Sequence, residues 1–221
     1  MSNYLDLIVF GMIALFLVLR LRSILGRRTG FERPAPQAPV MMRAAQVIDG
    51  TAMQVPIPSL HPLPDPNSPV GRALLAIKQI EPAFDPAQFL LGAESAFRLI
   101  VTAFAAGDCQ SLERLLTPET YQAFESAIKM RQQAGETQIS DIKTVLDAII
   151  ENASLRPGPN GAQIAGITVR FASHQVNLTK DKDGTVLTGS DGITEMVDIW
   201  GFERVLGSAE PTWRLASAQS A

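Results

Sequence analysis

Apolar residues between Asp85 and Phe124 recur at the three- and four-residue spacing of helices that bury one face. The first of these helices is predicted to begin at Asp85, an N-cap residue, with Pro86 in the first helical position and Gln88 completing a capping box. Its apolar stripe consists of Leu90, Ala93, Phe97, Ile100, Val101 and Phe104. A face so rich in phenylalanine requires a broad apolar partner, which the second half of the chain can supply as a sheet.

Two shorter helices are predicted directly after the long one. Gly107 is suited to end the long helix in a left-handed backbone conformation, and Asp108 is suited to cap the next helix. Thr117 and Pro118 then begin a third helix. The apolar residues of these two helices are Leu112, Leu115, Leu116, Tyr121, Phe124 and Ile128.

An amphipathic helix at residues 69–80 is predicted to precede this region, with Ser68 as its cap and Pro69 in its first position. Its aliphatic stripe lies opposite Arg72 and Lys78, so the helix suits either the membrane surface or the surface of its own domain. A stripe of aliphatic residues without an aromatic makes a weak interfacial anchor. Packing on the domain is therefore the favoured interpretation.

The second half of the chain carries strand patterns. Residues 139–155 combine the apolar spacing of a helix with the alternation of a strand, and we interpret them as one long bent strand. Residues 163–178 alternate between apolar and polar positions, but the apolar residues change from odd-numbered to even-numbered positions along the segment, which indicates a bulge or bend. Residues 182–184 are a hairpin signal. Further strands are predicted at 185–187, 193–206 and 212–218. Helices followed by consecutive antiparallel strands predict an α+β domain in which a curved sheet covers the apolar helices.

Near the N-terminus, residues 5–19 are apolar apart from Asp6 and predict a membrane anchor within residues 4–22. The uncharged run from 8 to 19 is short against the roughly 20 residues of a standard span, so snorkelling arginines must extend it. A cleaved signal peptide would have basic residues before the apolar run and small residues after it. Here the arginines follow the run, which favours an uncleaved anchor.

The positions of these arginines predict the orientation of the anchor. By the positive-inside rule the N-terminus lies outside, and the remaining chain lies in the cytosol. Basic side chains at the surface can also pair with anionic lipid headgroups. The residues predicted to face the membrane surface are Arg20, Arg22, Arg27, Arg28, Arg72 and Lys78.

A tether is predicted between the anchor and the domain, over residues 23–67. After its basic start it carries eight prolines between residues 31 and 67, a composition typical of an extended linker. Within it, residues 40–48 (VMMRAAQVI) are apolar enough to form a short docking helix, and transient structure without a partner is the alternative. The folded domain is predicted at 68–221.

Composition and charge narrow the classes of partner. The chain has 221 residues, of which 46% are hydrophobic, enough for one domain with a real core. Residues 1–80 carry a net charge of +4 and residues 81–221 a net charge of −7. The acidic half argues against nucleic acid, whose phosphates require clustered lysine and arginine. Cys109 is the single cysteine, and we interpret it as a structural thiol.

No pattern of residues indicates catalysis, a cofactor or a metal. The catalytic residue types on predicted strands are Asp147, His174, Glu195 and Asp198. We interpret Asp198 as half of a structural ion pair with Arg170, and His61 belongs to the predicted linker. The chain has no metal-ligand spacing, phosphate-binding glycine loop or nucleophile elbow, so we predict no enzyme and no cofactor.

Three segments together resemble the bacterial TimA family, relatives of the membrane-tethering scaffold of the mitochondrial presequence import motor. They are RLRSILGRRTGFE after the anchor, FLLGAESAFRLIVTAFAAGD on the long helix, and DIWGFERV followed by TWRL. The resemblance is to both ends of the chain and to residues 69–218. It implies a domain of the nuclear-transport-factor-two-like type, a cone with an apolar pocket. Gly201 stands where the family more usually has threonine, and glycine there predicts a local bulge.

The resemblance implies a membrane-anchored adaptor at the cytosolic face of the bacterial inner membrane, with a translocon subunit or a DnaK-type chaperone system as its protein partner. Anionic lipid, attracted by the arginines after the anchor, is an additional partner. The alternatives are a carrier of lipid or another small hydrophobe and, third, an enzyme of the ketosteroid-isomerase type. The residues expected to form either plain core or a pocket for an acyl chain or hydrophobic peptide are Phe97, Ile100, Val101, Phe104, Phe124, Phe171, Trp200, Phe202 and Trp213.

Overall fold

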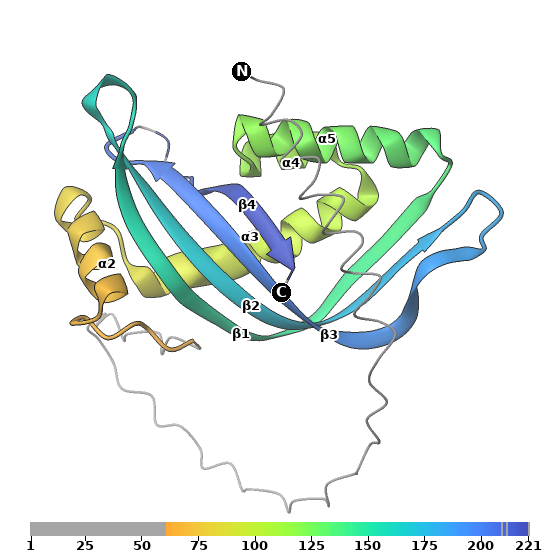
Figure 1. The fold of residues 1–221 in the computed structure, drawn as a ribbon, viewed down its shortest axis with the longest axis horizontal. Helices are drawn as coiled ribbons and strands as arrows, with labels where there is room; N and C mark the ends of the chain where they lie inside the picture. The colour runs from red at the N-terminus through yellow and green to blue at the C-terminus, as the bar shows by residue number, and fades with distance from the viewer. Residues whose placement is uncertain (1–60, 209, 211, 221) are drawn as a thin grey trace, which may run out of the picture.

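The computed structural model describes residues 61–208, 210 and 212–220, so the predicted anchor at 4–22 and most of the predicted linker lie outside the described residues. Helices come first along this part of the chain and strands follow (Figure 1). The helices are α2 (Pro69–Ile80), α3 (Pro86–Ala106), α4 (Cys109–Leu115) and α5 (Pro118–Gln133). The strands are β1 (Thr137–Pro157), β2 (Gln163–Lys180), β3 (Val186–Val205) and β4 (Arg214–Ser220), with the short 3-10 helix η1 (Pro159–Gly161) between β1 and β2.

The strands form one curved sheet in the order β1-β2-β3-β4, and each neighbouring pair is antiparallel. The long helix α3 runs across the concave side of this sheet, with α4 and α5 beyond it and α2 beside β1 (Figure 1). This arrangement confirms the predicted α+β class, with helices packed on a curved antiparallel sheet.

The helices begin where the capping residues predict. The side chains of Ser68, Asp85 and Thr117 accept hydrogen bonds from backbone N–H groups in the first turns of α2, α3 and α5. Gly107 ends α3 in the left-handed conformation, with φ of 73°. Asp108 caps α4 by accepting from the N–H of Ser111 at 3.1 Å. These contacts are local in sequence, which is why the residue pattern predicts them.

The strands differ from the prediction in one main respect. Residues 185–187 and 193–206 were expected as separate strands, but they belong to the single strand β3. The polar, glycine-containing stretch between them stays paired with β2 and forms a bulge, with Gly189 at φ of 79° and a register shift between Gln175 and Asn177. The same shift explains the change of parity along β2. The register against β4 shifts between Gly201 and Phe202, but the extra residue is Ala216 on β4, so this bulge lies opposite Gly201 and not in its own strand.

The core lies between α3 and the concave face of the sheet. Phe97 is fully buried, its ring stacked on that of Phe171 at a centroid distance of 4.5 Å, with the edge of Trp200 at 4.7 Å. By length and a mean hydropathy of 1.5, α3 could also cross a membrane. In this fold its apolar face packs inside the domain. Its buried residues are Phe89, Leu90, Ala93, Phe97, Ile100 and Ala103.

The amphipathic helix α2 packs on its own domain. Leu74 and Ile77 are buried members of the same core as the α3 phenylalanines, while Arg72 and Lys78 are exposed. Of the two interpretations of this helix, the structure therefore favours packing on the domain.

One part of the predicted linker belongs to the folded unit, which corrects its assignment as tether. His61 is only 7% exposed, because its ring lies between α3 and β1. The segment from His61 to Asn67, which we call the strap, then turns into α2 so closely that a Cβ on Gly71 would lie 2.0 Å from the carbonyl oxygen of Asp65. The sequence did not predict this packing, because the segment is rich in proline and the residues that His61 contacts are far away in the sequence.

Candidate functional site

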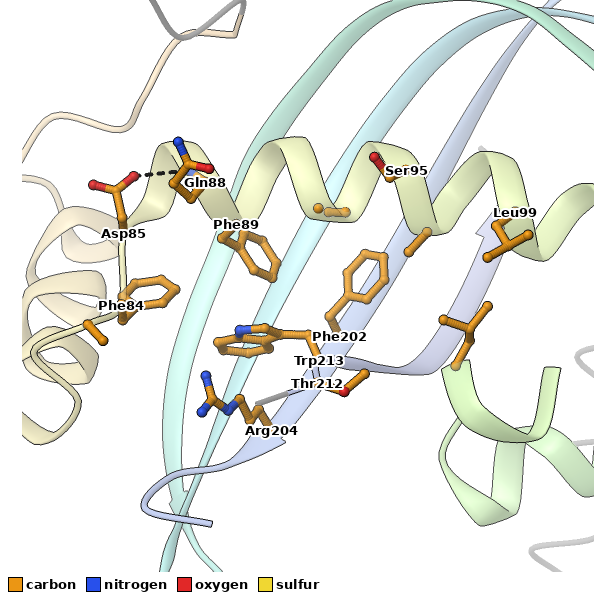
Figure 2. A pocket seen from close by; sticks show the side chains of 15 residues that line it. Phe84, Asp85, Gln88, Phe89, Ser95, Leu99, Phe202, Arg204, Thr212 and Trp213 are labelled. Carbon is orange, nitrogen blue, oxygen red and sulfur yellow. Dashed lines mark hydrogen bonds between the residues drawn. The ribbon is translucent and has the colours of Figure 1, made fainter. Parts of the chain in front are cut away.

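An open groove of about 460 Å³ lies between α3, the strand β3 and the residues just before β4 (Figure 2). We call it the apolar groove, because aromatic and small aliphatic side chains line most of it. Its lining residues are Ala83, Phe84, Asp85, Gln88, Phe89, Gly92, Ala93, Ser95, Ala96, Leu99, Leu115, Phe202, Arg204, Thr212 and Trp213. Concave apolar sites with a few polar groups are the usual binding sites for apolar ligands and peptide segments.

Four aromatic rings form one side of the groove, and in Figure 2 they point toward one another. The Phe89 ring meets Trp213 at a centroid distance of 4.8 Å and Phe202 at 6.0 Å, both edge to face. Phe84 lies 5.8 Å from Trp213 and 6.3 Å from Phe89. Such edge-to-face contacts hold the rings in place and keep this wall of the groove firm.

Small residues on α3 leave the groove open on its other side. Gly92 and Ala96 are four residues apart and therefore share one face of the helix. A Cβ placed on Gly92 would meet no atom within 4 Å, so this position faces free space. Leu99 extends the same face and is 49% exposed. A leucine or isoleucine at Gly92 would fill the space that these small residues leave.

Arg204 gives the groove one charged end. Its guanidinium Nη2 lies 2.5 Å from Glu81 Oε1, and both side chains are largely buried. Among the described residues, the Nε of Arg204 and the second carboxylate oxygen of Glu81 have no hydrogen-bond partner. A second cavity of about 410 Å³ shares Arg204 and Thr212 with the groove. The Arg204 Nε and this Glu81 oxygen are both buried, and only Arg204 of the pair lines the groove.

The nine predicted core or pocket residues fall into three places. Only Phe202 and Trp213 line the groove. The residues that are fully or almost fully buried in the core are Phe97, Ile100, Phe171, Trp200 and Phe202. Val101, Phe104 and Phe124 are partly buried and pack against that core. Phe104 meets Phe124 at 5.0 Å, away from the groove.

Phe84 and Phe89 line the groove but were missing from the sequence-based set. Asp85 is the cap of α3, so Phe84 and Phe89 occupy the positions just before the cap and four residues after it. This is the spacing of a hydrophobic staple, in which two apolar side chains meet across a helix start. The staple was the signal in the sequence that could have identified them.

His61 connects the strap to both layers of the fold. Its Nδ1 accepts a hydrogen bond from the backbone N–H of Ala148 at 3.2 Å, and its Nε2 lies 3.1 Å from Glu94 Oε2. Arg98 donates to the other oxygen of Glu94 at 2.9 Å. Burial acts to raise the pKa of Glu94, but the hydrogen bonds from His61 and Arg98 and the positive charge of Arg98 outweigh it and hold that pKa below its ordinary value.

The carboxylates of catalytic type lie outside the groove. Asp147 and Glu151 on β1 pair with Arg170 at 3.8 and 3.2 Å, whereas we had expected Arg170 to pair with Asp198. Asp198 accepts hydrogen bonds from Gln175 at 3.1 Å and from Ser220 at 2.8 Å. These residues line neither the groove nor the cavity beside it. Within the described part of the chain, no group of three or more His, Cys, Asp or Glu side chains could hold a metal ion.

The residues predicted to face the membrane are only partly described. Arg72 and Lys78 are exposed on α2, and Arg72 donates to the backbone oxygen of Asn67 at 2.5 Å. The other four lie outside the described residues. They are Arg20, Arg22, Arg27 and Arg28.

Comparison with known proteins identifies a family. The family model described as Tim44-like domain matches residues 70–220, which include the groove-lining residues. Among curated proteins, none matches the chain. A similar solved structure is the crystal structure of the intermembrane space region of the chloroplast protein ARC6. It is 12% identical, covers 62% of this chain and 97% of that chain, and has a TM-score of 0.42.

Proposed function

The chain belongs to the Tim44-like domain family, and from this premise we propose that it is a membrane-anchored adaptor whose domain binds a protein partner through the apolar groove. The observation that carries the proposal is the groove itself, an open apolar surface with fixed aromatic rings and one charged end. Surfaces of this kind are typical sites for an apolar peptide segment. The curved sheet wrapped on α3 supports the expected cone of the nuclear-transport-factor-two-like type.

The proposed adaptor is held at the cytosolic face of a bacterial inner membrane. Residues 4–22 form its single span with the N-terminus outside, and the following residues tether the domain, which we now begin at His61. Charge supports this arrangement, because the arginines after the span attract anionic lipid while residues 81–221, at −7, are repelled by it. The tether lets the domain stand off by more than the Debye length of about 8 Å. The groove then faces the cytosol, where a translocon subunit or a DnaK-type chaperone system is the proposed partner.

The test is affinity capture of the full-length protein from membranes, comparing the parent with Gly92→Leu. The leucine side chain fills the groove from a position that faces free space, so the domain should stay folded while partner capture falls at least several-fold. Gln122→Leu is the matched control, since it adds a leucine to an exposed position on α5. Equal partner capture by Gly92→Leu and the parent would show that the partner does not bind in the groove.

A reporter fusion tests the proposed orientation independently. Alkaline phosphatase fused after Ala221 should be inactive, because that enzyme folds to its active form outside the cytosol. Strong phosphatase activity would place the domain on the other side of the membrane and contradict a cytosolic partner.

A carrier of lipid or another small hydrophobe is the second candidate, and the apolar lining of the groove is what favours it. A carrier should retain lipid that native mass spectrometry detects, and it should bind cardiolipin-containing vesicles through α2. Arg72→Glu or Leu75→Asp on the exposed face of α2 should weaken that binding. Leu74 is unsuitable for the test, because it belongs to the core.

A further inference from the structure

The apolar groove offers a binding surface to the chain's own tether as well as to a partner. We propose that residues 40–48 occupy the groove in the free protein, so that a partner must displace them. The binding of residues 40–48 in the groove is argued only from the properties of the groove and of the tether. Its regulatory consequence rests on the proposed function, because it assumes that the partner uses the same groove.

The sequence of residues 40–48 matches the chemistry of the groove. As a helix, VMMRAAQVI would place Val40, Met41, Ala44, Val47 and Ile48 on one face. Gln46 and Met42 would lie on the opposite face, toward water, and Arg43 would lie at the edge of the apolar face beside Val47. Methionine adapts to irregular apolar surfaces and makes favourable contacts with aromatic rings, which the groove presents in Phe89 and Trp213. Nine residues of helix measure about 14 Å, a length comparable with the lining from Gln88 to Leu99 on α3.

The attachment point of the tether lies against α3, the helix that lines the groove, on the face of that helix opposite to the groove. The described chain begins at His61, which is held against Glu94 at 3.1 Å, and the neighbouring α3 residues Ala93 and Ser95 line the groove. The twelve residues between 48 and 61 can span up to about 40 Å, whereas a helix with its side chains is only about 10–12 Å across. The segment can therefore pass around α3 without strain. A short tether also gives the segment a local concentration in the millimolar range.

Charge favours this occupant over a second copy of the chain. Two copies would bring together domains whose residues 61–221 carry a net charge of −6 each, and like charges disfavour their association. Residues 40–48 carry a single charge, the positive Arg43 at the edge of the apolar face. The acidic domain therefore attracts this segment and repels its own copies.

Cysteine cross-linking in the full-length, membrane-inserted protein tests the contact directly. In a Cys109→Ser background, Val47→Cys is combined with Leu99→Cys in the groove or, as control, with Leu75→Cys on α2. Leu99 and Leu75 are the same residue type and are both 49% exposed, and Leu75 lies on α2, the helix that directly follows the strap in sequence. Oxidation should form a disulfide within one chain at position 99 several times faster than at position 75. Met41→Asp added to the first pair should lower its yield severalfold.

Three outcomes would overturn the proposal. They are no cross-link at position 99, equal rates at both positions, and a cross-link between two chains, which would make a second copy the occupant. The assay needs no partner, so it can succeed even where the adaptor function fails. Partner capture before and after cross-linking then tests the regulatory part, because the locked form should capture several times less partner. Equal capture by locked and open forms would show that the segment does not compete with the partner.

Discussion

Phe97 and Phe104 lie seven residues apart on α3 and occupy the same helical face, but their surroundings differ. Phe97 is fully buried between Phe171 and Trp200, whereas Phe104 is partly exposed. Arg131 also packs on Phe104, with its guanidinium carbon 5.0 Å from the ring centroid. The spacing of the sequence predicts the shared face, but the depth of burial depends on the sheet and on α5.

This difference predicts unequal costs of truncation. Phe97→Ala leaves a cavity inside the aromatic stack and should lower the free energy of unfolding by about 3–5 kcal/mol, against a total of about 5–15 kcal/mol. Phe104→Ala should cost about half as much, because solvent and Arg131 can occupy part of the space. Urea denaturation of residues 61–221 measures both values. Equal losses would show that the two rings have similar surroundings in solution.

Glu94 should make stability depend on pH in the acid range. Its pKa is lower in the folded protein than its ordinary value of 4.5, so the unfolded state binds the proton more readily. The stabilisation is therefore present above pH 4.5 and is lost as the pH falls through the lower, folded pKa. Glu94→Gln should flatten the fall in melting temperature between about pH 5 and pH 3. Glu113→Gln, an exposed carboxylate of α4, is the control and should leave that fall unchanged.

The sequence predicts contacts between residues that are close along the chain, but not contacts between residues that are far apart. The caps at Asp85 and Thr117 were predictable, because each side chain bonds a backbone group only three residues ahead. His61 was not predictable, because the backbone N–H that it accepts from belongs to Ala148, 87 residues further on. The groove residues Phe84 and Phe89 lay between these cases, since their staple spacing was visible but their contact with Trp213 was not.

At the scale of elements, α2 shows how one helix can suit a membrane and still belong to a domain. Its amphipathic pattern fits either environment, and only the packing of Leu74 and Ile77 against the sheet decides between them. The β3 strand gives a similar lesson. Its middle carries turn-forming residues, yet the hydrogen bonds to β2 continue through Thr188, Gly189 and Ser190. Pairing with a neighbouring strand overrode the local preference, and sequence alone does not show such pairing.

Two adjacent leucines on α2 test its role as part of the core. Leu74→Asp buries a charge at a position that is 5% exposed and should prevent stable folding of the domain. Leu75→Asp, at a position that is 49% exposed, should change the free energy of unfolding by no more than about 0.5 kcal/mol. Circular dichroism melting of the two variants is the measurement. A folded Leu74→Asp variant with the parent melting temperature would mean that α2 can leave the domain.

At the scale of the whole molecule, the boundary between the tether and the folded domain determines the point at which the domain is attached to its tether. The composition of the chain predicts that boundary at residue 68, since prolines crowd the preceding stretch. The structure packs the strap against the domain through His61, Asp65 and Gly71. A pull on the tether would therefore act first on His61, beside Glu94 and Ala148, at the middle of α3 and β1. This places the attachment point at the middle of α3, across that helix from the groove, instead of at the start of α2.

Two fragments of the chain test this boundary. Residues 61–221 and 68–221 both keep Ser68, which caps α2, so they differ only by the strap. Losing the buried contacts of His61 should cost about 1–2 kcal/mol, which for a domain of this size corresponds to a fall of roughly 2–8 °C in melting temperature. His61→Ala in the longer fragment should reproduce most of that fall, while Asn67→Ala at an exposed position of the strap should not. If the two fragments melt together, the strap adds no stability, and the tether acts on the domain from Ser68 onward.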